Sequence, residues 1–104
     1  MKHTASTRIH NILMAKYRLE ISDANSGEVV DALNFEEAIE QDAKKRIYAD
    51  LLGAAKDYCD GEYTGKLFRL NPTSGNWTEV SAPVIACKVA SGMAALTVAK
   101  VDYD

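Results

Sequence analysis

The sequence is poor in the side chains from which small catalytic or metal sites are built. It has two histidines and two cysteines among 104 residues. His3 and His10 lie near the N-terminus, while Cys59 and Cys87 form neither a Cys-x-x-Cys pair nor a disulfide framework. We therefore predict that the protein is not an enzyme, with no catalytic residue, no metal and no cofactor. Both cysteines are expected to be small core residues of a reduced, cytoplasmic protein.

Other absences narrow the class of protein further. No stretch approaches the roughly 18 apolar residues of a membrane-spanning helix, and the N-terminus has no apolar segment followed by a small-residue cleavage site. Gly61 and Gly65 lack the Lys-Ser/Thr that a phosphate-binding loop needs. With 47% hydrophobic and 26% charged residues, the chain has the composition of one globular domain.

The net charge of −3 conceals an uneven distribution along the chain. Residues 1–18 contain four basic side chains and no acidic one, whereas residues 19–43 contain eight acidic side chains and no basic one. Three basic residues, Lys44, Lys45 and Arg46, follow directly. This block of acidic residues is the compositional feature that stands out most.

Two regions are expected: an N-terminal arm over residues 1–13, which is a candidate for disorder, and one α+β domain over residues 14–104. Residues 14–22 alternate, with Tyr17, Leu19 and Ile21 on one side, which predicts a half-buried strand. Residues 23–27 have turn composition, and residues 28–33 are predicted to close a hairpin.

A long helix is predicted next. Asn34 has the character of an N-cap with Glu37 three residues on, and the helix is expected to run to about Cys59 and stop at Gly61. Apolar residues recur at intervals of four from Phe35 to Cys59. Such a ridge winds about 240° around the axis, which implies a bend near Gly53 or a second surface packed on the helix end.

The remaining chain is predicted to be β-structure. Residues 66–70 and 77–80 flank a turn, and residues 84–89 and 93–101 form two more strands. The expected fold is an α+β domain, an antiparallel sheet of about five strands in the order β-β-α-β-β-β with one long helix packed on one face.

Acidic residues of the predicted hairpin and helix start are the first candidate binding site. A carboxylate surface attracts a basic groove, although solvation of an exposed face explains it equally simply. The apolar residues of the helix end are expected to contact a partner or a second copy of the chain. These two groups are Glu28, Asp31, Glu36, Glu37 and Glu40, and Tyr48, Leu52 and Tyr58.

The alternative is a module that binds single-stranded nucleic acid through the hairpin between Lys66 and Trp77. Lys66, Phe68, Arg69 and Trp77 combine cations with aromatic platforms. The negative net charge opposes a phosphate-binding surface, so direct nucleic-acid binding is the less favoured interpretation.

In size and charge, though in no motif, the chain looks like small accessory proteins of phages and mobile elements, including anti-CRISPR proteins. That likeness implies a non-enzymatic inhibitor that binds a complex of the host. The block of acidic residues points to a complex that handles nucleic acid, and the lack of a long apolar stretch predicts no membrane association.

Overall fold

The computed structural model describes residues 14–82 and 85–97, which form one antiparallel sheet and one helix. The chain order is β1 (Ala15–Asp23), β2 (Val29–Glu37), α2 (Glu40–Ala55), β3 (Gly61–Leu70), β4 (Trp77–Glu79), β5 (Ile85–Ala90) and β6 (Met93–Leu96). Across the sheet the order is β2-β1-β3-β5-β6, and β4 pairs with the far end of β3. The predicted fold class, an antiparallel α+β domain with a single helix, is confirmed.

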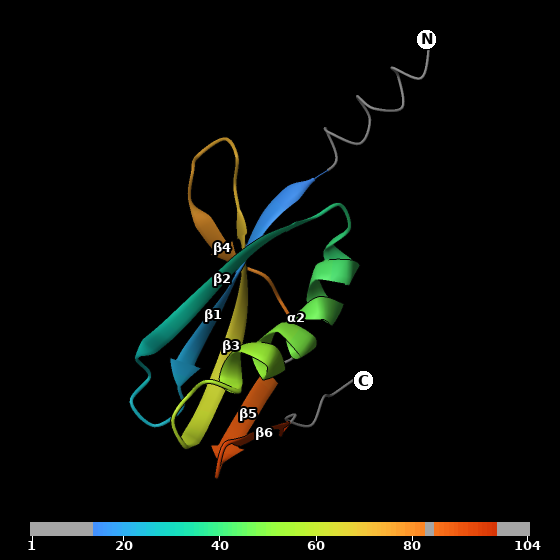
Figure 1. The fold of residues 1–104 in the computed structure, drawn as a ribbon. Helices are drawn as coiled ribbons and strands as arrows, with labels where there is room; N and C mark the ends of the chain where they lie inside the picture. Colours follow the sequence, from blue (N-terminus) through green and yellow to red (C-terminus); the bar gives the residue numbers. More distant parts are fainter. Residues whose placement is uncertain (1–13, 83–84, 98–104) are drawn as a thin grey trace, which may run out of the picture.

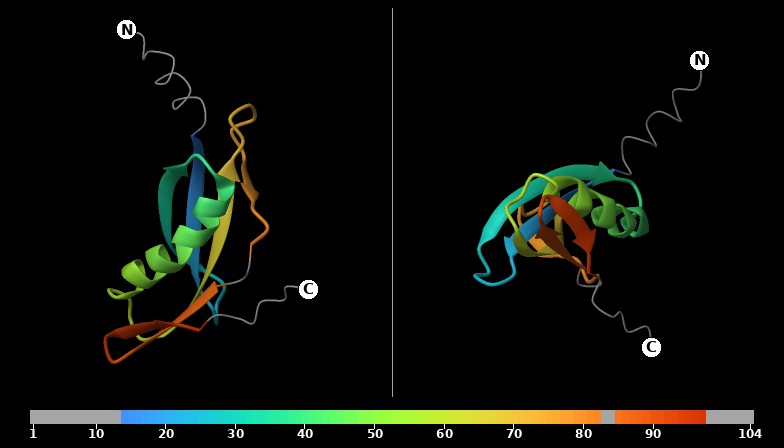
Figure 2. Two further views of the ribbon diagram at one scale, coloured as in Figure 1. Left: turned by 90° about the vertical axis from the view of Figure 1, so that its right-hand side faces the viewer. Right: turned by 60° about the horizontal axis from the view of Figure 1, so that its bottom comes forward.

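The helix α2 lies across one face of the twisted sheet (Figure 1). Two further views place it on that side, with β2 along one border and β5 and β6 along the other (Figure 2). Within the described residues the opposite face of the sheet carries no helix, and we call it the open face. Side chains on this face lie outside the core between α2 and the sheet.

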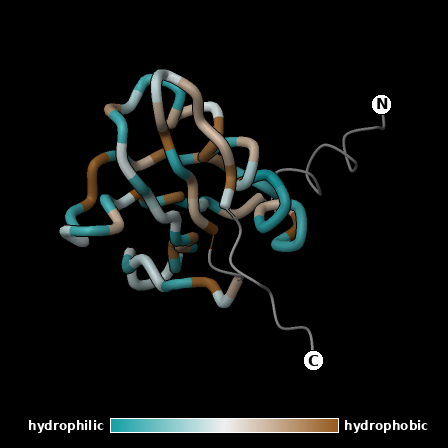
Figure 3. The backbone as a smooth tube through the Cα atoms, turned by 90° about the horizontal axis from the view of Figure 1, so that it is seen from below, coloured by the Kyte–Doolittle hydropathy of each residue, from teal (hydrophilic) through white to brown (hydrophobic). Residues whose placement is uncertain are grey.

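The core fills the space between α2 and the sheet. Tyr17, Leu19 and Ile21 are at most 1% exposed, so the alternation of β1 predicted its buried side. Hydrophobic and hydrophilic positions are interspersed along the described residues (Figure 3). The remaining buried residues come from α2, β3 and β5: Ala43, Ile47, Leu51, Ala55, Tyr63, Leu67, Ile85, Cys87 and Val89.

The helix is shorter at both ends than the sequence predicted. Its start at Asn34 was wrong, because residues 29–37 form β2 and Ile39 is the N-cap. Its end near Cys59 was also wrong, because α2 ends at Ala55 and Gly61 already belongs to β3. Of the apolar residues that recur at intervals of four, only four lie within α2. Together they turn through about 120° around the helix axis. One sheet face therefore covers them, and neither a bend nor a second surface is needed.

Pairing with β1 explains why residues 34–37 are extended. Tyr17 is paired with Phe35 and Ala15 with Glu37, and the Tyr17 and Phe35 rings stack with centroids 5.6 Å apart. The capping pattern around Asn34 is a local signal worth about 1 kcal/mol. A nine-residue strand with an aromatic cross-strand pair outweighs it.

The two predicted turns form as their composition indicated. Asp23 Oδ1 accepts hydrogen bonds from the backbone N–H groups of Asn25 and Ser26, at 2.7 and 3.1 Å. Asn71 Oδ1 accepts in the same way from the N–H groups of Thr73 and Ser74. These side-chain bonds replace ladder bonds where the chain reverses.

Several boundaries differ or lie outside the described residues. β3 begins at Gly61, five positions before the predicted start, because its first half pairs with β5. The predicted arm over residues 1–13, the predicted strand start at Val84 and the stretch from residue 98 lie outside the described residues. No helix in the described part of the chain is long and apolar enough to cross a membrane.

Candidate binding surface

The five acidic candidates do not share one surface. Glu28 lies in the turn before β2, and Glu40 is the first residue of α2. On β2, Asp31 and Glu37 belong to the side of the strand that faces α2, because Phe35 and Leu33 between them pack against the core. Glu36 therefore points to the open face. The structure thus distributes these carboxylates around the border formed by β2.

Three of these carboxylates are engaged within the chain. Asp31 Oδ2 accepts a hydrogen bond from the Tyr58 hydroxyl at 2.8 Å. Glu37 pairs with Arg46 at 3.0 Å, and Glu40 lies 3.6 Å from Lys44 Nζ and 3.7 Å from an Arg69 nitrogen. Part of the acidic block therefore serves to attach α2 and the segment after it to the sheet.

Arg46 is the centre of this attachment. Its guanidinium bonds Glu37 and Asp50, each at 3.0 Å, and lies 4.2 Å from the centroid of the Phe35 ring. Burial acts to lower the pKa of Arg46, but the hydrogen bonds to the two carboxylates outweigh it and raise that pKa. Arg46 is therefore a fixed positive charge between α2 and β2.

The three apolar candidates also pack inside the chain. Tyr48, Leu52 and Tyr58 are half-buried and contact the core from its border. The Tyr58 ring lies against Tyr63, with centroids 5.0 Å apart. Their exposed parts remain accessible, so a contact with a partner or a second copy is still a prediction.

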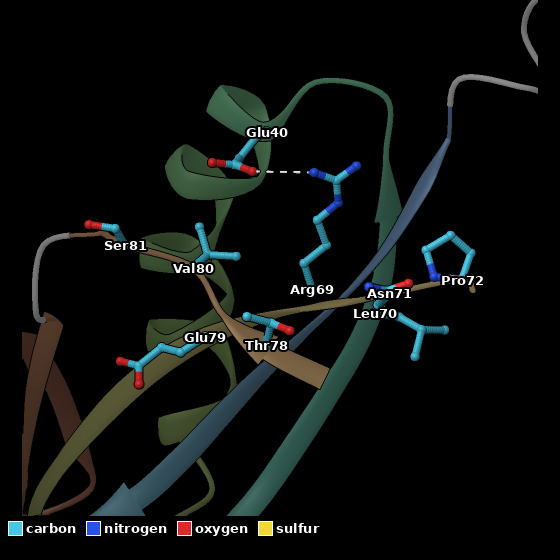
Figure 4. A pocket seen from close by; sticks show the side chains of 9 residues that line it. All are labelled: Glu40, Arg69, Leu70, Asn71, Pro72, Thr78, Glu79, Val80 and Ser81. Carbon is cyan, nitrogen blue, oxygen red and sulfur yellow. Dashed lines mark ion pairs between the residues drawn. The ribbon is translucent and has the colours of Figure 1, made fainter. Parts of the chain in front are cut away.

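The nucleic-acid candidates divide between the two faces. Phe68 is half-buried and Lys66 exposed, both pointing away from the buried Leu67 toward the open face. Trp77 lies on the same side, because its pairing partner is Leu70. Arg69 points the other way, toward Glu40 in the first turn of α2 (Figure 4).

Sequence reasoning missed Arg18, which lies on β1 beside Phe68 and Trp77. Its guanidinium carbon lies 4.2 Å from the centroid of the Trp77 ring, and its Nε donates to Asn34 Oδ1 at 3.1 Å. Arg18 is paired with Phe68 across β1 and β3. The alternation of residues 14–22 already placed Arg18 on the polar side of its strand, but only the register of three strands brings it to Trp77.

We call Arg18, Phe68 and Trp77 the aromatic–arginine cluster. With Arg18 itself included, the charged side chains of the open face close to the cluster balance, three basic against three acidic. A shallow hollow of about 410 Å³ beside Trp77 is bordered by Lys16, Asn34, Glu36 and Leu70. The open-face charges near the cluster are Lys16, Arg18, Lys66, Glu20, Glu36 and Glu79.

A second hollow lies at the start of α2. It measures about 480 Å³ and is lined by residues of β3, β4 and the following loop together with Glu40 (Figure 4). Its charged groups are Arg69, Glu40 and Glu79. Arg69 and Glu79 are exposed to solvent, and Glu40 is partly exposed. No histidine or cysteine borders it.

The cysteines have opposite environments. Cys87 is buried as predicted, and burial raises the pKa of its thiol, which disfavours the reactive thiolate. The prediction that Cys59 is a core residue was wrong, because it follows the end of α2 and is exposed. His3 and His10 lie outside the described residues. In the described part of the chain no group of three or more histidine, cysteine or acidic residues is arranged to hold a metal ion.

Comparisons of the chain with protein-family models, with curated proteins and with solved structures find no match.

Proposed function

We propose that this chain is a non-enzymatic protein-binding domain that contacts its partner through the open face around the aromatic–arginine cluster. The observation that carries the proposal is the Arg18 guanidinium over the Trp77 ring, on the side of the sheet opposite α2. Tryptophan and arginine are the residues that most often dominate the binding energy of protein interfaces. Their positions on paired strands hold them rigid, which lowers the entropy lost on binding.

The balanced charges of the open face favour a protein partner over a bare phosphate backbone. A nucleic-acid surface is expected to carry an excess of Lys and Arg, whereas the open face at the cluster, with Arg18 itself included, carries equal numbers of acidic and basic side chains. An aromatic centre with a mixed charged rim is the usual anatomy of a protein interface.

The partner we propose is a complex with a basic surface, such as one that handles nucleic acid. A net charge of −3 and the block of acidic residues between Glu20 and Asp42 would accelerate encounter with such a surface. An inhibitor of the kind that phages and mobile elements encode, anti-CRISPR-like in size and charge, is the biological role we propose.

Single-stranded nucleic acid is the second candidate ligand. It is favoured by the placement of Phe68 and Trp77 on one face with Lys66 and Arg18, since bases stack on aromatic rings beside cations. Trp77 is the sole tryptophan of the chain, so its fluorescence reports directly on this surface.

One set of variants tests both candidates. The wild-type chain, Trp77→Ala, Arg18→Ala and the control Lys45→Ala, an exposed residue of α2, are used to capture proteins from a cell lysate. A specific partner should be retained by the wild type and the control, and lost or weakened about tenfold by Trp77→Ala. Equal capture by Trp77→Ala would contradict the proposed surface.

The same proteins are then titrated with a single-stranded oligonucleotide at low salt. A protein-binding domain predicts unchanged Trp77 fluorescence. Quenching that disappears in Arg18→Ala and at high salt would instead assign the surface to nucleic acid. If the captured partner itself binds nucleic acid, added oligonucleotide should compete with the chain for it.

A further inference from the structure

The outer edge of β2 is the longest unpaired strand edge among the described residues. β2 pairs with β1 on one side, and no described strand pairs with its other side. A register shift lies opposite Ile21 and Ser22, but from Asp31 to Glu37 the pairing is regular. At about 3.4 Å per residue, this is about 20 Å of continuous edge.

One backbone group shows which way this edge is turned. The N–H of Ala32 donates to the carboxylate of the preceding Asp31, at 2.8 Å, as an outward N–H without a neighbouring strand does. The two-residue period of a strand turns the N–H groups of Asn34 and Glu36 in the same direction. These two positions are therefore the donors that an added strand would meet.

Beyond the register shift, from Asp31 to Glu37, the edge lacks the usual protection against strand addition except for its charge. Residues 29–37 contain no proline and no lysine, which are the common blocking residues at sheet edges. They contain three carboxylates, with Glu28 immediately before them. A second copy of β2 would bring another set of carboxylates to the same edge, which is unfavourable, so the charge of the edge disfavours self-pairing and favours a basic strand.

We propose that the outer edge of β2 binds an extended basic segment of a partner protein as an additional strand of the sheet. Backbone hydrogen bonds from Asn34 and Glu36 would supply affinity, and a Lys or Arg of the segment would lie beside Glu36. Glu36 carries this role because it is exposed, whereas Asp31 and Glu37 are already held by Tyr58 and Arg46.

This site is separate from the aromatic–arginine cluster, although both lie on one molecule and one partner can occupy both. Arg18 donates to Asn34 across β1 and β2, so the open face and the β2 edge meet at that residue. The two proposals are tested independently by probing the edge with peptides and retaining Trp77→Ala as a control.

The probe is a ten-residue peptide of alternating Lys and Thr, titrated calorimetrically into the full chain at low salt. The expected result is saturable binding, together with shifted amide NMR signals at Asn34 and Glu36. A peptide of alternating Glu and Thr should not bind. A Lys-Thr peptide with N-methyl groups along one backbone edge should bind about tenfold more weakly, since two or more backbone bonds are lost.

Two variants of Glu36 distinguish the contribution of backbone pairing to binding from the contribution of charge. Glu36→Gln removes the carboxylate and keeps the N–H, while Glu36→Pro removes both, and proline is tolerated at an edge position whose N–H faces solvent. Strand addition predicts that Glu36→Pro weakens binding more than Glu36→Gln. Trp77→Ala should bind the peptide as the wild type does.

Two results would overturn the proposal. One is equal affinity for the plain and N-methylated peptides, which would show that the edge attracts the peptide by its negative charge and not by backbone pairing. The other is the absence of any binding by the Lys-Thr peptide. Circular dichroism checks that each variant is folded, and if Glu36→Pro is not, the comparison of plain and N-methylated peptides decides alone.

Discussion

The hydroxyl of Tyr58 donates a hydrogen bond to Oδ2 of Asp31 at 2.8 Å, joining the segment after α2 to the border strand β2. The two residues are 27 positions apart in the chain. Burial, and then the bond to Asp31, raise the pKa of Tyr58 above its ordinary value of 10.0. This contact therefore links the stability of the α2–β2 attachment to pH.

Tyr58→Phe removes this hydrogen bond and should lower the free energy of unfolding by about 1 kcal/mol at pH 7. Because the folded-state pKa is the higher one, the stabilisation is fully present below pH 10 and is lost as the pH rises through the raised folded-state pKa. The difference between wild type and variant, measured by urea unfolding, should therefore shrink above pH 10. A difference that is constant with pH would show that the phenol proton has no role.

Two neighbouring leucines of α2 should differ in their contribution to stability. Leu51 is fully buried and Leu52 half-buried. Leu51→Ala should cost about 2–5 kcal/mol through the cavity it leaves, and Leu52→Ala about 1 kcal/mol. Urea unfolding of both variants measures this. An equal loss would mean that Leu52 belongs wholly to the core, and would remove it as a contact for a partner.

The sequence predicted best those elements whose signal is periodic and local. Alternation identified the buried side of β1, and the interval of four identified Ile47 and Leu51 as core residues of α2. Asn71 and Asp23 identified turns because their side chains bond the neighbouring backbone. In each case the decisive interaction lies within a few residues of the pattern.

Prediction from the sequence failed where pairing with a strand distant in the chain determines the local structure. Asn34 is followed by Glu37 as in a helix cap, but the pairing of Phe35 with Tyr17 makes the segment a strand. The candidate surface shows the same limit. Phe68 and Trp77 could be named from their residue types, whereas the contact of Arg18 with Trp77 depends on the register of β1, β3 and β4, which no local pattern contains.

Two glycines should respond oppositely to alanine. A Cβ at the buried Gly65 would lie 3.0 Å from Ile85 Cδ1 and 3.1 Å from Leu19 Cδ1, so Gly65→Ala should cost about 1–3 kcal/mol by overpacking. Gly53 is in α2 with nothing within 4 Å, so Gly53→Ala should gain about 0.5–1 kcal/mol. Thermal unfolding of the pair tests this, and a stabilising Gly65→Ala would show that the core between β1 and β5 is loosely packed.

The start of α2 offers a stabilising substitution. Ile39 occupies the N-cap position with extended backbone angles (φ −122°, ψ 126°), makes no side-chain bond to the helix and is 57% exposed. Ile39→Ser supplies a hydroxyl that accepts from the free N–H groups of the first turn, so it should raise the free energy of unfolding by about 1 kcal/mol.

The matched control is Ala38→Ser, one residue before the cap, which should leave stability unchanged. Asn34→Ala provides a second comparison. As a strand residue, Asn34 should lose only its bond from Arg18, with no change in helix content by circular dichroism, whereas a capping role would predict fraying of α2. If Ile39→Ser gave no gain while Asn34→Ala reduced helicity, the helix boundary at Glu40 would be wrong, and the β2 edge that depends on it would be lost as well.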